Sequence, residues 1–564
     1  MYSKSHKLRL SSFLLFSIFL LIVLLARLYY IQIVKFDSFS KIALNQQDIT
    51  INISPQRGVI YDRTLKELAI SLKVYSAWAN PRLIKDKTRA ADRVSDILDL
   101  DSSLVLERLN KNKSFVWLKR MISEPELNGL NDSQIKGVYL LAESKRFYPK
   151  GKLASHLLGF CGLDGYGLEG VELSYDNFLR GAVGWRYTLQ DGRGKEITTM
   201  EKELMPTING RNLILTIDEI IQYIAEEELL QAVDKWKAVS GTIIIMEPST
   251  GKILALANYP TFNPNFFSNT KPRFWRNRAI TDCFEPGSTF KIVTASAALE
   301  EGLLNLDDKF YCEEGAYKIG KRILHDYHPY GWLTFKEVIV KSSNIGTVKV
   351  AREVLGGERL QRYIKRFGFG EKTGIDLPGE IVGIAKDPSQ WSGTTLSAIP
   401  IGQEIAVTAL QLASAVSCIA NGGLLIKPRV VGEIRDEDFK VVRSFKPEVI
   451  RRLLSEKVAA QMRSILKGVV EKGTGRLAGL NGYTAAGKTG TAQKARLDGK
   501  GYFRRKFVAS FIGFAPVREP AISVVVILDE PRPVHFGGVV CAPVFKKVAE
   551  KILSYLEIRP DETG

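Results

Sequence analysis

An uncharged apolar segment near the N-terminus limits what this chain can be more than any other feature does. The sequence carries no charge from Leu10 to Ala26, and Arg27 alone interrupts the apolar pattern before Ile33. A stretch of this length can span a bilayer as one helix. We therefore predict a short tail over residues 1–10 and a transmembrane anchor over residues 11–34.

A cleaved signal peptide is the alternative for such a segment. A cleavage site needs small residues after the apolar run, whereas Leu28–Ile31 stand there as Leu-Tyr-Tyr-Ile. We therefore expect an uncleaved anchor. Lys4, Lys7 and Arg9 precede the span, and positive charge ahead of a span keeps the tail in the cytoplasm. The rest of the chain then lies outside the cytoplasm.

The balance of charged residues is strongly basic, at +18 over 564 residues. Such a balance fits nucleic acid, an anionic membrane surface or an anionic polymer. The sequence has no zinc-finger spacing and no RNA-binding aromatic signature, so we expect no nucleic-acid partner. Its five cysteines are scattered without a C-x-x-C pair, which argues against a metal cluster or a disulfide-built scaffold.

Strand and helix signals intermix along the chain after the anchor. Two apolar runs around a Pro-Ser-Thr-Gly turn predict a hairpin over residues 240–258, and a capping box at Thr216 predicts a helix start. Hairpins join most of the strands, so we predict an α+β fold with an antiparallel sheet. The stretch over residues 188–212 is polar and contains several glycines, which predicts a boundary between two domains. We predict one domain over 35–208 and another over 209–560.

Residues Gly482–Thr489, GYTAAGKT, fit the phosphate-binding loop of many nucleotidases. Such a loop must leave a buried strand and enter a helix. Here no strand-like run precedes it, and the glycine-rich residues that follow lead to a probable turn at Asp498-Gly499. That pattern is typical of a hairpin, so a P-loop NTPase remains only a remote alternative.

None of the five histidines stands in a recognisable triad setting, and His325–His328 is expected to be a polar surface loop. We therefore look for a serine activated by lysine. The pattern S-x-x-K suits this chemistry because residues three apart share a helix face. It occurs six times, but Ser288 alone follows Pro-Gly at the start of an apolar helix. At a helix start, free backbone amides can stabilise an oxyanion formed on the attacked carbonyl, and Lys291 lies one turn further on the same face. The alternative is that Ser288 is only the N-cap of this helix.

Two further motifs fit the same chemistry. Ser342 and Asn344 in KSSNIG would point about 200° apart on a helix, so both can face a site only from a turn between helices. A K-T-G at Lys488 precedes a hairpin and can line a cleft, with Gly490 letting substrate backbone approach closely. The other K-T-G copy, at Lys372, is expected to be a loop.

S-x-x-K, S-x-N and K-T-G in this order resemble penicillin-binding proteins and serine β-lactamases. The segments EPGSTFK, TGIDLPGE, GKTGTAQK, RGVIYDR and GLEGVE extend the resemblance to class B penicillin-binding proteins over nearly the whole chain. It implies a transmembrane helix, an elongated mixed pedestal over 35–208, and a β-lactamase-like transpeptidase domain with a five-stranded antiparallel sheet flanked by helices. Glu285 and Gln493-Lys494 look like the septal, cell-division branch. Thr64-Leu65 and Glu404 depart from the usual family pattern.

The resemblance implies a peptidoglycan D,D-transpeptidase that needs no metal or organic cofactor. Lys291, lowered in pKa by burial and by cationic Lys488, would deprotonate Ser288 for attack on a D-Ala-D-Ala stem peptide. Ser342 would relay the proton to the leaving amine, with Asn344 positioning it. β-Lactams would trap Ser288 covalently.

Further roles follow from the same resemblance. Lys488, Thr489 and Thr491 would receive the terminal carboxylate, and the backbone N–H groups of Ser288 and Thr491 would form the oxyanion hole. Implied partners are a membrane glycan polymerase of the SEDS family and bitopic division proteins, at the division septum. An elongation-type transpeptidase, a β-lactamase or D,D-carboxypeptidase, and a non-catalytic membrane scaffold remain alternatives.

Overall fold

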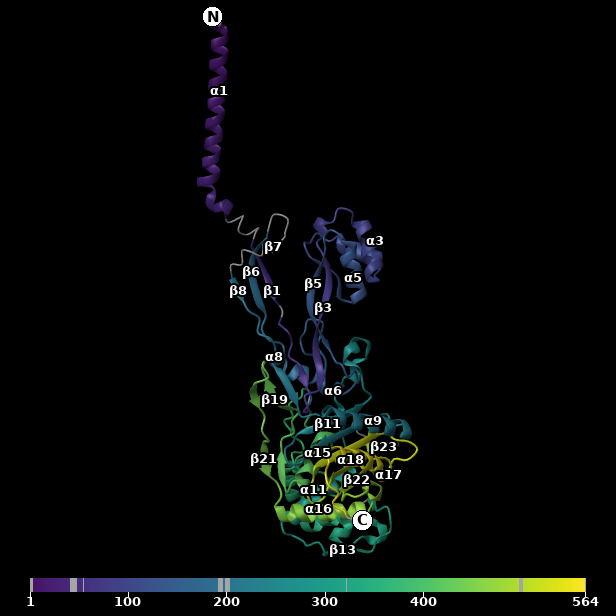
Figure 1. The fold of residues 1–564 in the computed structure, drawn as a ribbon. Helices are drawn as coiled ribbons and strands as arrows, with labels where there is room; N and C mark the ends of the chain where they lie inside the picture. The colour runs from purple at the N-terminus through teal and green to yellow at the C-terminus, as the bar shows by residue number, and fades with distance from the viewer. Residues whose placement is uncertain are drawn as a thin grey trace. The chain divides into compact units, whose positions relative to one another are not determined.

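The computed structural model describes residues 4–40, 48–53, 55–190, 196–197, 203–320, 322–496 and 501–562 (Figure 1). The predicted turn at Asp498-Gly499 and much of the predicted boundary segment lie outside these residues. The chain divides into two compact units, one of residues 1–55 with 181–209 and one of 56–180 with 210–564.

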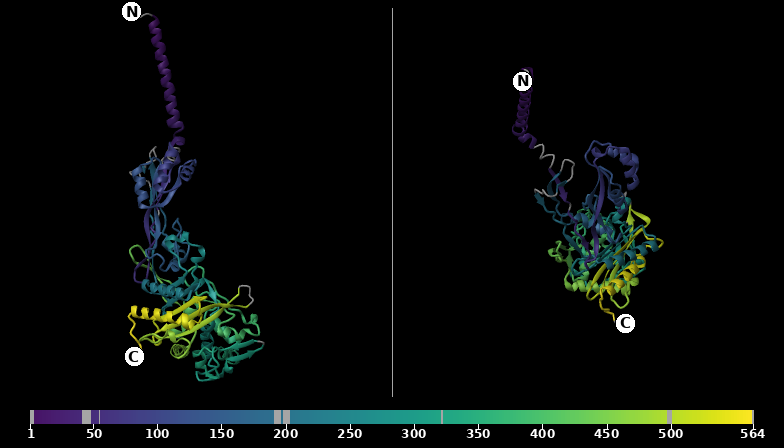
Figure 2. Two further views of the ribbon diagram at one scale, coloured as in Figure 1. Left: turned by 90° about the vertical axis from the view of Figure 1, so that its right-hand side faces the viewer. Right: turned by 45° about the horizontal axis from the view of Figure 1, so that its top comes forward.

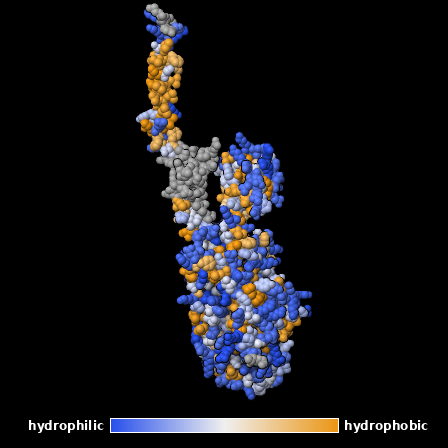
Figure 3. All heavy atoms as spheres, viewed as in Figure 1, coloured by the Kyte–Doolittle hydropathy of each residue, from blue (hydrophilic) through white to orange (hydrophobic). Residues whose placement is uncertain are grey.

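The smaller unit begins with the apolar helix expected from the sequence. Helix α1 covers Lys4–Tyr29 and continues as a π-helical turn over Tyr30–Val34. Residues His6–Val34 are long and apolar enough to cross a membrane, alone among the described helices, and their most apolar window has no buried residue. Figure 3 shows this helix covered in hydrophobic side chains, as a membrane anchor requires.

A small antiparallel sheet completes this unit. Strand β6 pairs with the other three strands. The strands are β1 (Asp48–Ile53), β6 (Gly184–Gln190), β7 (Glu196–Ile197) and β8 (Glu203–Met205).

The larger unit contains a sheet that runs through both halves of its sequence. Strand β9 pairs in parallel with β2 and antiparallel with β19, while β3 pairs with β2, β4 and β5. The strands are β2 (Ile60–Tyr61), β3 (Glu67–Ala79), β4 (Val116–Ile122), β5 (Val138–Phe147), β9 (Asn212–Leu215), β19 (Val431–Arg435) and β20 (Val441–Ser444). The boundary predicted between residues 208 and 209 stays a prediction.

Helices pack against β3 and β4 through a separate apolar core that includes Val94, Leu98, Leu109 and Leu118. These helices are α3 (Lys87–Leu98), α4 (Ser102–Leu109) and α5 (Glu124–Ser133).

The turn between β2 and β3 contains Leu65, which has φ +65°. A left-handed conformation of this kind favours glycine or asparagine, which explains why Thr64-Leu65 is an unusual pair for this turn.

A five-stranded sheet forms the centre of the larger unit, in the order β11-β10-β24-β23-β22 with every neighbouring pair antiparallel. The strands are β10 (Ser240–Met246), β11 (Ile253–Tyr259), β22 (Ala486–Ala495), β23 (Tyr502–Ala515) and β24 (Ile522–Asp529). This confirms the α+β fold and the hairpin predicted over residues 240–258.

Helices cover both faces of this sheet (Figure 1 and Figure 2). Alternate side chains of β10 enter two different cores: Ile243 and Ile245 pack with α9 and α18, and Ile244 and Met246 pack with α11 and α15. Burial on both faces explains the unbroken apolar runs of the central strands. The helices are α9 (Glu219–Trp236), α11 (Lys291–Glu300), α15 (Ala409–Ala420), α16 (Glu456–Glu471) and α18 (Ala542–Tyr555).

One local prediction from the sequence is wrong: the capping box expected at Thr216 does not form. The N-cap of α9 is Asp218, whose carboxylate accepts from the N–H groups of Ile220 and Ile221, because the Thr216 hydroxyl donates to Ile253 and Arg429 carbonyls instead. The prediction for the segment GYTAAGKT is confirmed, because it leads into strand β22 and not into a helix. It therefore lacks the helix N-terminus that a phosphate-binding loop requires.

Candidate active site

The nucleophile candidate, Ser288, lies in a 3-10 turn over Gly287–Phe290 that runs directly into α11. Gly287 has φ +57°, and a Cβ there would lie 2.8 Å from the Thr491 carbonyl oxygen, so only glycine fits between the turn and strand β22. A Cβ on Gly402 would lie 2.1 Å from the Gly287 carbonyl oxygen. Ser288 is half-buried, and its hydroxyl has no hydrogen bond to any described residue.

Lys291 is fully buried one turn after Ser288. Its Nζ donates to the Ser342 carbonyl at 2.7 Å, to Asn344 Oδ1 at 2.8 Å and to Ser342 Oγ at 3.3 Å. Burial lowers the pKa of Lys291 to about 7, against the opposing charge of Asp326. A large fraction of this amine is therefore neutral near pH 7 and able to take a proton.

Ser342 and Asn344 lie in the turn between two helices, as the sequence predicts. Helix α12 covers Phe335–Val340 and α13 covers Asn344–Lys349, with Ser343 as the N-cap of α13. Ser342 has φ +59°, a strained conformation for a residue with a side chain. The Asn344 side chain bridges the His325 segment and Lys291. Its Nδ2 donates to the His325 carbonyl at 3.0 Å, and its Oδ1 accepts from Lys291.

Lys488 approaches the same turn from the edge strand β22. Its side chain is fully buried, and its Nζ donates to Ser342 Oγ at 2.7 Å and to the Thr489 carbonyl at 3.3 Å. Burial and the charge of Lys291 hold the pKa of Lys488 well below its usual value. Hydrogen bonds thus join Lys291, Ser342, Asn344 and Lys488, which are far apart in the sequence, beside the Ser288 turn.

The residues after Lys488 are engaged within the protein. Thr489 Oγ1 shares a hydrogen bond of 2.7 Å with Thr474 Oγ1, and Thr491 Oγ1 accepts from the Gly537 N–H at 3.1 Å. A Cβ on Gly490 would lie 2.3 Å from Ser510 Oγ and 2.9 Å from the Pro286 carbonyl oxygen. Gly490 therefore lets the Ser288 turn approach the strand, a role that the sequence did not suggest.

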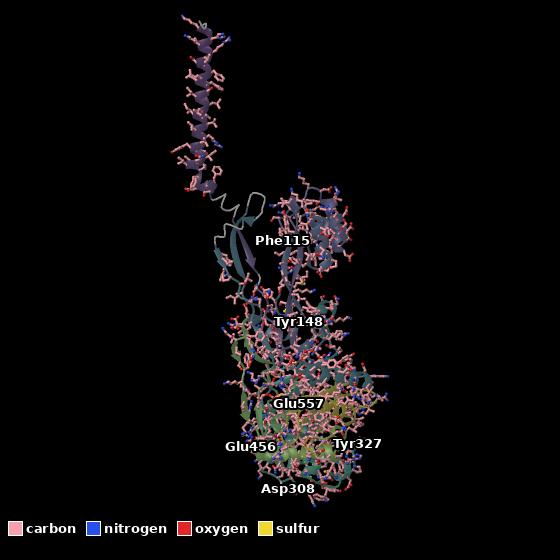
Figure 4. The ribbon with its side chains drawn as sticks, viewed as in Figure 1. Phe115, Tyr148, Asp308, Tyr327, Glu456 and Glu557 are labelled. Carbon is pink, nitrogen blue, oxygen red and sulfur yellow. The ribbon has the colours of Figure 1, made fainter. Side chains whose placement is uncertain are left out.

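Sequence reasoning missed Asp326, which lies in the loop expected to be only a polar surface. Its carboxylate accepts from Ser343 Oγ at 2.5 Å, from the Ile345 N–H at 3.1 Å and from the Asn344 N–H. Asp326 thereby caps α13 and holds Asn344 in place. The neighbouring Tyr327 is exposed at the surface (Figure 4). No local pattern marks Asp326, because an N-cap is sought next to its helix.

Glu404, which departs from the usual family pattern, connects two loops beside the nucleophile turn. It has φ +59°, which explains why glycine is common there. Its N–H donates to Glu285 Oε1 at 2.9 Å, and its carboxylate accepts from Thr395 Oγ1 at 2.7 Å. Burial and the Glu404 charge raise the pKa of Glu285, which also accepts from the Tyr502 hydroxyl at 3.1 Å.

Comparisons with known proteins match both halves of the chain. The penicillin binding protein transpeptidase domain matches residues 241–550, and the penicillin-binding protein dimerisation domain matches residues 52–215. Stage V sporulation protein D of Bacillus subtilis (strain 168) is 35% identical over 560 residues, which cover 98% of this chain and 86% of that protein. Peptidoglycan D,D-transpeptidase FtsI of Escherichia coli (strain K12) is 32% identical over 546 residues, 95% of this chain and 90% of that protein.

Solved structures share the fold over most of the chain. Penicillin binding protein 3 of Mycobacterium tuberculosis, complexed with aztreonam, aligns with a TM-score of 0.71 and 28% identity, covering 91% of this chain and 98% of that chain. A peptidoglycan synthetase from Bifidobacterium adolescentis aligns with a TM-score of 0.74 and 26% identity, covering 92% and 98%.

Proposed function

The chain belongs to the class B penicillin-binding proteins, and on that premise we propose that it is a peptidoglycan D,D-transpeptidase with Ser288 as its nucleophile. One observation carries the assignment of the site. The buried amines of Lys291 and Lys488 both donate to Ser342 Oγ beside the Ser288 turn, so that a base, a proton relay and a second amine meet at one hydroxyl.

The first half-reaction forms an acyl-enzyme. The Ser288 oxygen attacks the carbonyl of the penultimate D-Ala in a stem peptide, while neutral Lys291 accepts the hydroxyl proton. The peptide bond breaks, and the departing amine of the terminal D-Ala receives a proton through Ser342. The backbone N–H groups of Ser288 and Thr491 stabilise the negative oxygen of the tetrahedral intermediate.

The second half-reaction forms the cross-link. The amine of a neighbouring stem peptide attacks the acyl-enzyme carbonyl, loses its proton through the same groups, and releases Ser288. The Lys488 amine donates hydrogen bonds to the substrate carboxylate, together with the hydroxyls of Thr489 and Thr491, and the negative charge of the bound carboxylate favours the protonated form of Lys488. A β-lactam enters the first half-reaction only, and it stays bound to Ser288 as an ester because its amine cannot leave.

The setting of the enzyme is also part of the proposal. The apolar helix anchors the chain in the membrane, and Lys4, Lys7 and Arg9 keep the tail in the cytoplasm and the catalytic part outside. We assign the protein to the division septum, with a glycan polymerase of the SEDS family and bitopic division proteins as partners. Similarity to FtsI supports this assignment. An elongation role would give dispersed sidewall signal for a fluorescent fusion, in contrast to midcell bands.

Covalent labelling with a fluorescent penicillin tests the site. The full chain in detergent should become labelled, and Ser288→Ala should abolish the label. Ser464→Ala is the matched control, because Ser464 also stands in an S-x-x-K but lies exposed on α16; it should label normally. Label that survives in Ser288→Ala would exclude this nucleophile, and an adduct that turns over rapidly would favour a β-lactamase.

A further inference from the structure

Strand β23 has a bulge beside the active-site strand β22. Lys494 of β22 stands opposite four residues of β23, Phe503–Lys506, where regular pairing would place one. Strand β24 pairs with β23 only from Val508 onward, so the bulge lies beyond the end of β24, on the part of the hairpin that extends from the sheet (Figure 2). Bulges occur often beside active sites, where they redirect side chains.

Two arginines of the bulge have no counter-ion. The Lys506 ammonium is paired with the Glu530 carboxylate at 3.2 Å. Arg504 and Arg505, in contrast, are exposed, and neither forms a hydrogen bond or an ion pair with any residue that the structure describes. Their positive charges are therefore available to an anionic ligand.

A hydrogen bond joins the bulged strand to the segment that carries the nucleophile. Tyr502, the residue directly before the bulge, donates its hydroxyl to Glu285 Oε1 at 3.1 Å. Glu285 stands three residues before Ser288. The bulge therefore begins next to a residue that contacts the nucleophile segment, which brings Arg504 and Arg505 close to the active site.

A second hairpin brings a further arginine to Tyr502. Strands β14 (Ala316–Ile319) and β15 (Arg322–His325) form this hairpin. Burial raises the pKa of the Tyr502 hydroxyl, and the charge of Arg322 opposes that shift, so the guanidinium lies near this side chain. Arg322 is exposed and has no hydrogen bond or ion pair within the described part of the chain. Unpaired arginines from two hairpins thus lie around Tyr502.

We propose that Arg504, Arg505 and Arg322 bind the carboxylates of the acceptor stem peptide, the peptide whose amine attacks the acyl-enzyme. This inference rests on the proposed function, which identifies that peptide. A guanidinium donates two parallel N–H groups to a carboxylate, a geometry that the lysine ammonium lacks. The carboxylate of the donor peptide is already assigned to Lys488, so the acceptor peptide supplies the carboxylates for these arginines.

Such binding gives the acceptor an advantage over water. Both can attack the acyl-enzyme, and attack by water would waste the activated stem peptide. Arginines that hold the acceptor beside the Ser288 segment raise its local concentration at the acyl-enzyme, so cross-linking is favoured over hydrolysis.

Binding is tested with the full chain in detergent micelles after complete acylation by penicillin, which occupies the place of the donor peptide. The probe is the tetrapeptide L-Ala-γ-D-Glu-L-Lys-D-Ala with a fluorescein on its N-terminus, and fluorescence anisotropy measures its binding. The probe should bind in a saturable way, more weakly as salt rises. The same peptide with both carboxylates converted to amides should not bind. No binding, or equal binding of the amide, would overturn the proposal.

Three variants and one control locate the site. Arg504→Gln, Arg505→Gln and Arg322→Gln should each weaken binding by roughly threefold to fivefold, as for exposed ion pairs. Arg518→Gln is the matched control, because Arg518 is also exposed and lies in the turn at the other end of β23; it should leave binding unchanged. An equal loss in Arg518→Gln would show a general effect of net charge and overturn the proposal.

Penicillin labelling separates this inference from the proposed function. All four variants should label normally, because a β-lactam reacts without an acceptor peptide. The anisotropy measurement also works on protein that penicillin fails to label. Peptide binding without labelling would refute the proposed function alone, and labelling without peptide binding would refute this inference alone.

Discussion

Lys291 and Lys488 donate to the same oxygen atom, Ser342 Oγ, at 3.3 and 2.7 Å. Both amines are fully buried, and burial is the largest cause of the lowered pKa of each. Since two adjacent cations in a buried site repel each other, the arrangement favours a state in which at least one amine is neutral. Such a site carries a base at neutral pH without using histidine.

The first prediction concerns the pH dependence of acylation. Only neutral Lys291 can take the Ser288 proton, and burial lowers its pKa to about 7. The second-order rate of β-lactam acylation should therefore rise with pH and reach half its plateau at about pH 7. Stopped-flow measurement with a chromogenic cephalosporin gives this profile. A rate that is flat across this range, or that falls with rising pH, would exclude Lys291 as the base.

The second prediction concerns stability. In the unfolded chain, Lys488 is protonated at every pH below its usual pKa, whereas the folded state resists protonation of this amine. Folding near neutral pH therefore costs the free energy of removing that proton, and Lys488 destabilises the folded state. Lys488→Met should raise Tm, by roughly 1 °C for each kcal/mol of relief in a unit of this size, while acylation falls by about 10²-fold or more. Calorimetry and penicillin labelling measure the two effects. Lys372→Met is the control, since Lys372 stands in the other K-T-G and is exposed; it should change neither Tm nor acylation. A lower Tm for Lys488→Met would contradict the argument.

The third prediction concerns Asp326, whose charge raises the pKa of Lys291. Asp326→Asn removes that charge but keeps an oxygen to cap α13, so the midpoint of the acylation profile should move to lower pH. Glu337→Gln is a matched control. Glu337 also caps a helix, as part of the capping box of α12, but its charge does not contribute to the lowered pKa of Lys291. An unchanged or higher midpoint for Asp326→Asn, or equal shifts for both variants, would contradict an effect of the Asp326 charge on Lys291.

The fourth prediction concerns the contact between β22 and the nucleophile turn. A methyl group at Gly490 would meet the Pro286 carbonyl oxygen at 2.9 Å and displace the turn. Gly490→Ala should therefore slow acylation by about 10²-fold, the typical cost of a small misplacement. Gly393→Ala, where a Cβ meets nothing within 4 Å, is the control. Normal acylation by Gly490→Ala would mean that the turn adapts without loss.

Local patterns in the sequence sufficed for much of the site. Pro-Gly before Ser288, the spacing to Lys291 and the turn at Ser342 each depend on neighbouring residues, and the structure has all three as predicted. The hairpin over residues 240–258 is local in the same sense. Long-range contacts were not predictable from these patterns. Asp326 caps a helix that begins eighteen residues later in the chain.

The same distinction explains the error at Thr216. Thr216 satisfies the spacing of a capping box, but its hydroxyl bonds carbonyls of two other segments, a tertiary contact that outweighs the local preference. Gly490 was expected to let substrate backbone approach closely, which stays a prediction; the atoms nearest its Cβ position belong to Ser510, Thr289 and Pro286. A sequence motif shows that a small residue is needed and does not show which neighbour needs the space.

Three glycines lie where the nucleophile turn contacts its neighbouring segments: Gly287, Gly402 and Gly490. A Cβ at any of these positions would lie too close to the facing backbone or side-chain atoms. We therefore expect that drug-resistant variants with a working enzyme do not arise by substitution at these positions. We expect selection by β-lactams to act on side chains around the turn, such as Glu404 and Tyr502, which both hydrogen-bond to Glu285.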